Sequence, residues 1–352
     1  MKKNNTAHIF LAETVLHILF SVAVIEAFFT EEKKIIIWFG DANIKERYPW
    51  LFEDKEIEFI VVNNPSNLSF FKLDISVKEI QEKIEYLASY DCSITTYYDT
   101  AYGFEIIRDY LNIPWEKVSL LEDGQANYLR NVAMPSQSRR VAKHLVNKIM
   151  GRFGLNMSLY NLGGNLKIRT FFSMSPEHVY ILSPAQSKVH SIASNVKNIL
   201  KRSTIELIGD SLQDVDGVIT LTPIYAYKRK TKRELLIFLD QTVTKYSIQR
   251  PLIKPHPRDY SLGITTDILE YFGNTVELSP EVPTEFLFEH LGPCKWYGPP
   301  SSAMLNRHFI YPDVRDEFYI SEFGTSSQFA KKQVQVFRDI MGDKAIEFKA
   351  VI

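Results

Sequence analysis

The feature that most constrains this chain is a repeated alternation between short, continuous apolar runs and longer stretches with helical periodicity. Such runs are typical of strands buried on both faces of a parallel sheet, and the helices between them cover those faces. In the first half, the pattern predicts strands at residues 7–12, 33–40, 57–64, 91–98 and 117–124. Helices are predicted at residues 13–29, 77–90 and 103–112. The first half is therefore predicted to form a doubly wound α/β domain.

A second series of the same kind begins near residue 177, after a segment, 125–175, that we expect to be mostly helix and loop. Strands are predicted at residues 178–183, 204–209, 217–223, 235–241, 249–257, 275–280, 295–302 and 309–313. Helices are predicted at residues 282–291 and 325–342. A chain of 352 residues exceeds the usual size of a single core, so two domains are expected.

This organisation predicts an α/β fold of the GT-B type, in which two doubly wound, Rossmann-like domains face each other across a ligand-binding cleft. The N-terminal domain is expected to span residues 1–175 and the C-terminal domain residues 176–324. The last segment, residues 325–352, is expected to contain a helix that crosses back onto the N-terminal domain.

Composition excludes several classes of function. The net charge of −1 provides no overall field that would attract nucleic acid. Cys92 and Cys294 are the two cysteines, and their separation argues against a zinc site or a disulfide framework, so we expect free thiols in a reducing cytoplasm. Two basic runs, at residues 138–148 and 227–234, are interpreted as solvated surface or as a contact for anionic lipid or a phosphorylated glycan.

The N-terminus superficially resembles a signal peptide, because Lys2 and Lys3 precede an apolar run. His17, Ser21 and Glu26 interrupt that run, which is too short and too polar for a transmembrane helix. We therefore expect the first β-α-β unit of a folded domain here.

An acidic motif follows the apolar strand predicted at residues 117–124. Glu122 and Asp123 lie at the end of this strand, and Gly124 permits a sharp exit of the chain. Ligands of open α/β sheets bind beyond the carboxyl ends of the strands, where a carboxylate is well placed to act as a general base. The simpler interpretation is an ordinary strand-to-loop turn, in which Asp-Gly is common.

A histidine between two prolines follows another predicted strand. Pro255 and Pro257 restrict the backbone around His256, and Lys254 and Arg258 add positive charge beside it. An imidazole held in this way can bond to a phosphate or protonate a leaving group. A surface turn is the alternative.

Two further motifs are typical of nucleotide binding. Ser301 and Ser302 follow a short strand and precede a predicted helix, whose N-terminus suits a phosphate, or they simply cap the helix. Glu285 lies in the first turn of another predicted helix, where it either stabilises the helix or accepts both hydroxyls of a ribose.

Several other motifs carry less weight. Neither a G-x-G-x-x-G fingerprint nor a P-loop is present. GDSL at residues 209–212 matches the name of an esterase family but lies mid-chain and lacks the later Asp-x-x-His of that family. The Asp-x-Asp at residues 214–216 is interpreted as a turn.

The ordered set of motifs resembles bacterial sialyltransferases, in particular the lipooligosaccharide sialyltransferase and capsular polysialyltransferase group. The matching residues are Glu122-Asp123-Gly124, then His256-Pro257, then Ser301-Ser302. The matching residues are confined to these three short motifs, whereas the similarity expected in the architecture extends over nearly the whole chain.

The resemblance implies an inverting glycosyltransferase that needs no metal or other cofactor and uses CMP-sialic acid as its donor. Either Glu122 or Asp123, with Asp123 favoured, would take the proton from the acceptor hydroxyl, and His256 would assist the departing CMP. Ser301, Ser302 and Lys254 would bind the phosphate, and Glu285 the ribose. Asp240, expected at the end of the strand at residues 235–241, is an alternative base.

The acceptor implied by the resemblance is a terminal galactose or sialic acid of a bacterial surface glycan, such as lipooligosaccharide or capsule. The expected location is the cytoplasm, with peripheral contact at the inner face of the membrane through the basic runs, and a homodimer is a further expectation. Two alternatives keep the fold: a transferase for CMP-Kdo or a UDP-sugar, and a non-catalytic glycan-binding protein.

Overall fold

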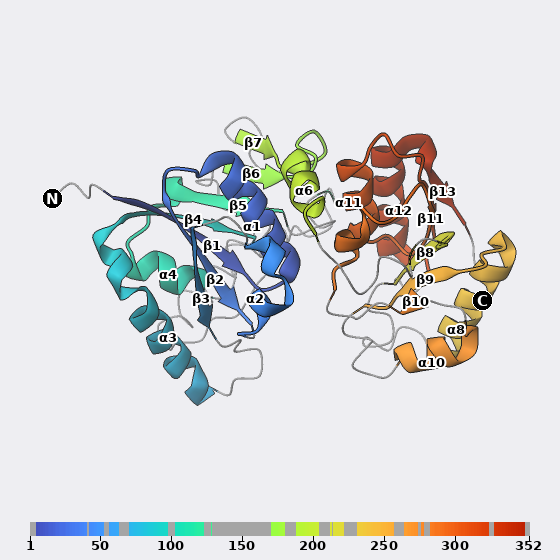
Figure 1. Ribbon diagram of the computed structural model, residues 1–352, viewed down its shortest axis with the longest axis horizontal. Coiled ribbons are helices and arrows are strands. Elements are labelled where there is room, and N and C mark those ends of the chain that lie inside the picture. Colours follow the sequence, from blue (N-terminus) through green and yellow to red (C-terminus); the bar gives the residue numbers. More distant parts are fainter. Residues whose placement is uncertain are drawn as a thin grey trace. The chain divides into compact units, whose positions relative to one another are not determined.

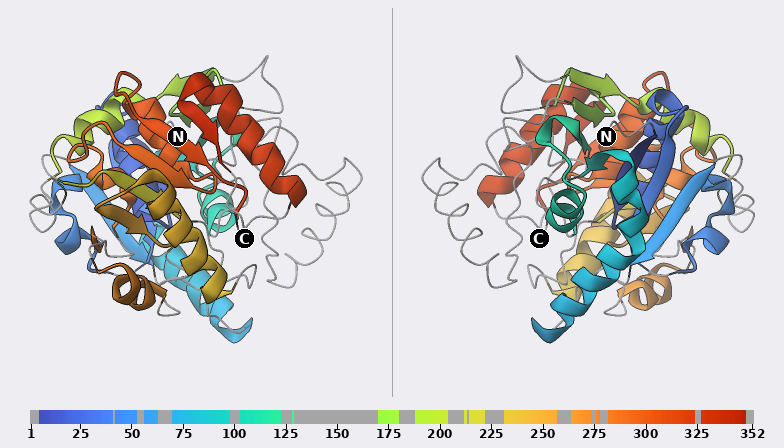
Figure 2. Two further views of the ribbon diagram at one scale, coloured as in Figure 1. Left: turned by 90° about the vertical axis from the view of Figure 1, so that its right-hand side faces the viewer. Right: turned by 90° about the vertical axis from the view of Figure 1, so that its left-hand side faces the viewer.

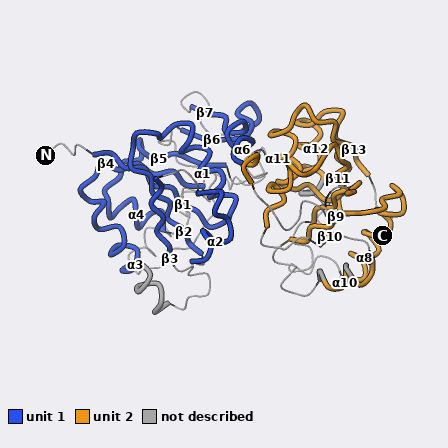
Figure 3. The backbone as a smooth tube through the Cα atoms, in the orientation of Figure 1, with its two compact units in different colours: residues 1–199 blue, residues 200–352 orange. Residues whose placement is uncertain are grey.

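The computed structural model of the protein divides into two compact units, residues 1–199 and 200–352 (Figure 3). The structure describes residues 5–40, 42–52, 56–62, 70–97, 103–122, 128, 170–179, 188–203, 212, 214–221, 231–256, 264–273, 276–277, 282–323 and 327–348.

The first unit is built around a seven-stranded parallel sheet with the order β3-β2-β1-β4-β5-β6-β7. Its strands are β1 (Thr6–Ala12), β2 (Lys33–Phe39), β3 (Ile57–Val62), β4 (Asp91–Thr96), β5 (Val118–Leu121), β6 (Thr170–Ser173) and β7 (Lys188–Ser191). Its α-helices are α1 (Val15–Phe28), α2 (Ile44–Arg47), α3 (Phe70–Ile84), α4 (Phe104–Tyr110) and α6 (Ala193–Leu200). Short 3₁₀ helices are η1 (Pro49–Leu51), η2 (Glu85–Ser89) and η3 (Trp115–Lys117).

The predicted elements of the first half are confirmed, because their apolar runs fill both faces of this sheet. One face packs Ile9, Ile37 and Ile94 against Ile80 of α3 and Ile107 of α4. Figure 1 shows α3 and α4 on one side of the sheet and α1 on the other. The middle of α1 is buried on every side, which explains why its sequence is apolar all round.

The second unit contains a six-stranded parallel sheet with the order β10-β9-β8-β11-β12-β13. Its strands are β8 (Gly217–Thr220), β9 (Pro251–Lys254), β10 (Val276–Glu277), β11 (Lys295–Gly298), β12 (Glu317–Ile320) and β13 (Ala345–Glu347). Its helices are α8 (Lys232–Tyr246), α10 (Ile264–Phe272), α11 (Ser302–Ile310) and α12 (Ser327–Met341), with the 3₁₀ helices η6 (Thr284–Leu287) and η7 (Gly342–Lys344). Figure 2 shows this unit facing the viewer in its left-hand view.

The core of the second unit fixes which strand residues are available for a site. Ile219 and Ile253 pack in one buried cluster with Phe238 of α8. Successive side chains along a strand point to opposite faces. Thr220 and Lys254, the next residues of β8 and β9, therefore point to the other face, and they are partners in the strand register.

Two strands predicted in the second half are wrong. Residues 235–241 belong to α8, which begins with a capping box between Thr231 and Glu234 and buries Leu235, Phe238, Leu239 and Thr242 along one stripe. Residues 309–313 contain the end of α11 and a turn, and the strand follows at β12. The helix predicted at residues 282–291 is reduced to η6 and turns.

The units also divide at a different place from the predicted boundary. β7 pairs with β6 at Phe171↔Val189, so the first sheet extends beyond residue 175. α12 leads into β13, which pairs with β12, so this C-terminal segment belongs to the second unit. Short strands such as β6 and β7 lack a long apolar run and were not predicted. The strand at residues 204–209 and the basic run at 138–148 lie outside the described residues.

Gly298 allows the chain to leave β11 very close to β8. Its φ is +136°, and a Cβ atom at this position would lie 2.1 Å from the carbonyl oxygen of Thr220. Glycine is the residue that tolerates both the positive φ and the missing space. The route of the chain from β11 to Ser301 therefore depends on this glycine.

We expect Gly298→Ala to lower the free energy of unfolding of the second unit by about 3 kcal/mol, because it adds a clash to a strained φ. Gly273 is the control, since its φ is +60° but no atom lies within 4 Å of its added Cβ. Gly273→Ala should cost about 1 kcal/mol. Denaturant unfolding followed by circular dichroism measures the free energy of unfolding of both variants. Equal losses of this free energy would contradict the close approach of Gly298 to the Thr220 carbonyl.

Candidate functional site

The second sheet has a topological switch point between β8 and β11. The chain proceeds from β8 to β9 and β10 on one side, and then returns to place β11 and β12 on the other. Ligands of open α/β sheets bind at such a point, outside the carboxyl ends of the strands. Thr220 ends β8, and Ser301 lies just after β11, with their hydroxyl oxygens 3.0 Å apart.

This hydroxyl pair is suited to an anion. Ser301 caps α11, and its Oγ accepts a hydrogen bond from the backbone N–H of Met304 at 3.4 Å. The two hydroxyls have two protons, and their mutual hydrogen bond uses one of them, so one remains to be donated to a ligand. The first turn of α11 directs further backbone N–H groups and the positive end of the helix dipole to the same place.

Lys254 and His256 lie at the end of the neighbouring strand β9. Lys254 is 7% exposed. Burial lowers the pKa of its ammonium group to about 8, although the negative charge of Glu285 raises it. His256 is half-buried two residues later, after the buried Pro255, whereas Pro257 lies outside the described residues. The predicted residues Lys254 and His256 thus follow β9, and Ser301 and Ser302 follow β11; these two strands flank β8 in the sheet.

Glu285 lies on η6 and is 3% exposed. Its Oε1 accepts a hydrogen bond of 2.8 Å from the side-chain amide of Asn306. Burial raises the pKa of the Glu285 carboxyl, and the Asn306 hydrogen bond and the Lys254 charge oppose this shift.

In the first unit, Glu122 follows β5 and is fully buried. Its Oε2 accepts three hydrogen bonds: one from the hydroxyl of Tyr128, one from the hydroxyl of Ser173 at 2.8 Å and one from the backbone N–H of Met174 at 2.6 Å. Burial beside this carboxylate raises the pKa of Tyr128 well above its usual value, so the tyrosine stays a donor. Glu122 therefore ties the chain after β5 to the end of β6. Asp123 lies outside the described residues.

The first sheet has its own switch point, between β1 and β4. His17, in the first turn of α1, stacks on Tyr97 after β4, with ring centroids 4.0 Å apart. Its Nδ1 accepts a hydrogen bond from the backbone N–H of Glu13 at 3.2 Å, so a neutral ring carries its proton on Nε2. These residues lie where a doubly wound domain binds its ligand, although no sequence motif marked them.

Asp240 is not at the end of a strand, which corrects the reason for proposing it as a base. It lies within α8 on the exposed side of the helix, while Leu239 beside it is buried. The Asp-x-Asp motif is confirmed as a turn, because the backbone N–H of Val215 donates to the Leu212 carbonyl at 3.2 Å. The carboxylate of Asp216 accepts hydrogen bonds from the backbone N–H groups of Gln249 and Arg250 at 2.8 and 3.0 Å.

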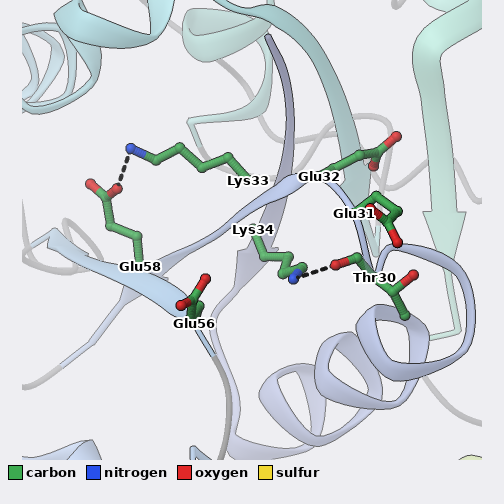
Figure 4. A pocket seen from close by; sticks show the side chains of 7 residues that line it. All are labelled: Thr30, Glu31, Glu32, Lys33, Lys34, Glu56 and Glu58. Carbon is green, nitrogen blue, oxygen red and sulfur yellow. Dashed lines mark hydrogen bonds and ion pairs between the residues drawn. The ribbon is translucent and has the colours of Figure 1, made fainter.

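A charged cavity of about 450 Å³ lies at the opposite edge of the first sheet, at the start of β2 and just before β3 (Figure 4). It is lined by Thr30, Glu31, Glu32, Lys33, Lys34, Glu56 and Glu58. Its lysines are already engaged, since Lys33 pairs with Glu58 at 2.8 Å and Lys34 donates to the Thr30 carbonyl at 2.8 Å. This cavity is remote from the carboxyl ends of the strands, where doubly wound sheets bind ligands.

Within the described ranges, no three His, Cys, Asp or Glu side chains gather closely enough to hold a metal ion. Among the helices that the structure describes, none is long and apolar enough to cross a membrane. Cys92 and Cys294 are both buried, and the described residues contain no disulfide between them.

Sequence reasoning missed Thr220, Tyr128, Ser173 and Asn306. A threonine closing the apolar run GVIT was the available signal for Thr220. Ser173 and Asn306 are far along the chain from their partners, at 51 positions from Glu122 and 21 positions from Glu285. Tyr128 is only 6 positions from Glu122, but no motif marks it.

Solved structures include chains with the same arrangement of two parallel-sheet units. One is the GT-B domain of a sialyltransferase from Photobacterium damselae, with 16% identity, a TM-score of 0.52, and coverage of 98% of this chain and 100% of that chain. Another is UDP-GlcNAc 2-epimerase from Neisseria meningitidis bound to UDP-GlcNAc, with 15% identity, a TM-score of 0.55, and coverage of 96% and 92%. MnaA from S. aureus in complex with UDP has 12% identity, a TM-score of 0.55, and coverage of 96% and 88%.

These similarities establish the fold. The protein consists of two α/β units with parallel sheets, and its architecture is that of GT-B glycosyltransferases. No protein-family model matches the sequence, and a comparison with curated protein sequences gives no match.

We expect Tyr128→Phe to lower the free energy of unfolding of the first unit by about 2 kcal/mol, because it removes a buried hydrogen bond to a carboxylate. Tyr86→Phe is a matched control, since Tyr86 also donates to a glutamate, Glu58, but at an exposed site. The control should cost about 0.5 kcal/mol or less. Thermal unfolding of the two variants measures the difference, and equal costs would contradict a buried anchor at Glu122.

Proposed function

We propose that the protein is an inverting, metal-independent sialyltransferase that moves sialic acid from CMP-sialic acid to a glycan. The observation that carries the proposal is the grouping of Thr220, Ser301 and Lys254 at the switch point of the second sheet. Hydroxyls, a helix N-terminus and an ammonium group form a site for one phosphate. The similarity of the fold to a sialyltransferase GT-B domain supports the choice of donor.

In this proposal, the acceptor hydroxyl attacks the anomeric carbon of sialic acid and transfers its proton to the carboxylate of Asp123. The bond between the anomeric carbon and the phosphate oxygen breaks, and CMP leaves from the opposite face, so the configuration inverts. The transition state has oxocarbenium character. His256 donates a proton to the departing phosphate, while Lys254 and the hydroxyls of Thr220 and Ser301 stabilise its negative charge.

The hydrogen bonds of Glu122 favour Asp123 as the base. One oxygen of Glu122 already accepts three hydrogen bonds from groups of this chain, so it is occupied as an acceptor. These hydrogen bonds join the end of β5 to the end of β6. We therefore assign Glu122 a positioning role and Asp123 the role of the base. We expect Asp123→Asn to abolish transfer while CMP still binds.

The acceptor is proposed to be a terminal galactose or sialic acid of a bacterial surface glycan, such as lipooligosaccharide or capsule. The basic runs at residues 138–148 and 227–234 would bring the enzyme to the inner membrane surface, where such acceptors are assembled. Sedimentation with anionic vesicles tests this contact, and analytical ultracentrifugation tests the expected homodimer.

A UDP-sugar enzyme of the same fold is the second candidate, because similar structures were solved with UDP or UDP-GlcNAc bound. Purified protein should be incubated with CMP-sialic acid, CMP-Kdo and UDP-GlcNAc, each with and without lactosides, and the release of CMP or UDP measured. We expect CMP release from CMP-sialic acid and no nucleotide release from the other two donors. Lactosides should increase this CMP release. Release of UDP would favour the second candidate, and no release from any donor would favour a non-catalytic glycan-binding protein.

We expect His256→Ala to lower kcat by about 10²–10⁴-fold, because it removes the general acid for CMP departure. CMP affinity should change much less. His190→Ala provides the control, since His190 is half-buried in the first unit. Initial rates and calorimetric CMP binding separate the two effects, and an unchanged kcat would remove His256 from the mechanism.

We expect Thr220→Val to weaken CMP binding about tenfold, since it deletes a hydroxyl of the phosphate site without changing the size of the side chain. Thr242→Val is its isosteric control, because Thr242 is also buried in the second unit but bonds to the Phe238 carbonyl within α8. Titration calorimetry with CMP measures both variants. If Thr220→Val bound CMP as tightly as Thr242→Val, the phosphate would have to bind elsewhere.

A further inference from the structure

A buried amide on α11 contacts the carboxylate that was expected to bind the ribose. Asn306 is 1% exposed, and its side-chain nitrogen donates to Oε1 of Glu285 at 2.8 Å. Asn306 lies four residues after Ser302 on the same helix, so the two residues share one face and lie one turn apart. The ribose of a nucleotide is joined directly to its phosphate. A nucleotide whose phosphate binds at the start of α11 can therefore reach the Glu285–Asn306 pair with its ribose.

The orientation of the Asn306 amide is fixed by Glu285. An ionised carboxylate only accepts hydrogen bonds, so the amide must turn its nitrogen towards Glu285. Its oxygen, Oδ1, is buried and accepts no hydrogen bond from the residues that the structure describes. A buried acceptor without a donor destabilises a fold. The hydrogen bond to Glu285 thus explains why a polar side chain occupies this position.

The backbone around Glu285 is held to α11 by the next residue of the helix, Arg307. Its guanidinium donates to three backbone carbonyl oxygens at 2.6, 3.2 and 3.0 Å, those of Phe288, Leu291 and Gly292. Its Nε pairs with Asp316 Oδ2 at 2.7 Å, and both side chains of this pair are buried. Because Arg307 already fixes the backbone of the segment, the hydrogen bond from Asn306 adds a restraint on the side chain of Glu285.

We propose that Asn306 is a positioning residue that orients the Glu285 carboxylate for the ribose hydroxyls of the donor nucleotide. The inference rests on the proposed function, because it requires a nucleotide whose phosphate lies at the start of α11. An ionised carboxylate has about four acceptor positions, so the hydrogen bond from Asn306 leaves positions for both hydroxyls. Asn306 acts through Glu285 and does not contact the substrate.

Orientation matters here because both hydroxyls must be accepted at once. A glutamate has several rotatable bonds, and a side chain that is already held in place loses less conformational entropy when the ligand binds. The restraint therefore favours ligands that carry both hydroxyls, and it gives no advantage to ligands that lack them. Asn306 is thus expected to set the preference of the site for ribonucleotides.

The test compares the affinities for CMP and for 2′,3′-dideoxy-CMP, both measured by titration calorimetry. The natural protein should bind CMP at least about tenfold more tightly, because hydrogen bonds to a charged group are lost with the hydroxyls. Asn306→Leu, which removes the donor with little change in size, should reduce this preference to about threefold or less. The affinity for 2′,3′-dideoxy-CMP should change little.

Tyr311→Phe is the matched control for the loss of a hydrogen bond. Tyr311 follows the last residue of α11, and its hydroxyl donates to Oε1 of Glu289, on the same segment as Glu285, at 2.6 Å. This variant also removes a bond between the α11 region and a glutamate, but it leaves Glu285 untouched. The preference for CMP over 2′,3′-dideoxy-CMP should be the same as in the natural protein.

A double-mutant cycle tests whether Asn306 acts through Glu285. Glu285→Met, which replaces the carboxylate by an apolar group of similar shape, should remove the preference for CMP. In that background, Asn306→Leu should have no further effect on the preference. Further loss of preference in the double variant would show that Asn306 acts independently of Glu285, and it would overturn the proposal.

A purely structural role for the pair predicts a different pattern. The variants would then unfold at lower temperatures, but the preference for CMP over 2′,3′-dideoxy-CMP would remain. Under our proposal, the double variant Glu285→Met/Asn306→Leu unfolds at or above the temperature of the natural protein, since two apolar groups replace a buried polar pair. It has nevertheless lost the preference for CMP.

Asn306→Ser is a second variant that protects the test against misfolding of Asn306→Leu. The shorter hydroxyl does not reach Glu285, and it leaves space for a water molecule, so the preference for CMP should again fall. Circular dichroism checks that each variant folds. A preference that persists in either folded variant, or that is absent from the natural protein, would overturn this inference alone. Failure of the natural protein to bind CMP would overturn the proposed function and this inference with it.

Discussion

The close approach of Gly298, at the end of β11, to the end of β8 is the constraint on which the candidate donor site depends. Gly298 has no Cβ, so the segment after β11 can approach the Thr220 carbonyl to a distance that a side chain would forbid. That approach brings Ser301 within hydrogen-bond distance of Thr220 and starts α11 at the switch point of the sheet. The parallel register then places Lys254 beside Thr220. The approach at Gly298 and the register of β8 and β9 thus bring together groups from three strand ends.

Buried carboxylates have the same physical task in both units. A buried charge is tolerated only when hydrogen bonds or an opposite charge compensate for lost water. Glu122 accepts hydrogen bonds from a tyrosine, a serine and a backbone N–H, and it joins the ends of β5 and β6. Glu285 accepts a hydrogen bond from the side-chain amide of Asn306 and joins η6 to α11. In each unit, a buried acid thus connects two elements near the ends of the strands.

The errors in the predicted elements have a common cause. LLIFLDQ is apolar enough for a buried strand, but Thr231 and Glu234 upstream form a capping box, and the apolar residues fall on one helical stripe. The run FIYPD is divided between the last turn of α11 and the turn that follows. A short apolar run fits a buried strand or a buried helix equally well, and start signals outside the run decide between them.

The sequence alone determined the alternation of strands and helices, the parallel sheets and the GT-B type of fold, because burial on both faces imposes its pattern locally. It also located Glu122, Lys254, His256, Ser301 and Ser302 near strand ends. Only the tertiary structure decided what these groups touch. Tyr128 is 6 positions from Glu122, but the contacts of Ser173 with Glu122, of Asn306 with Glu285 and of Thr220 with Ser301 join residues 21 to 81 positions apart. These long-range contacts follow from the strand order and from the close approach of Gly298 to β8, which no local pattern encodes.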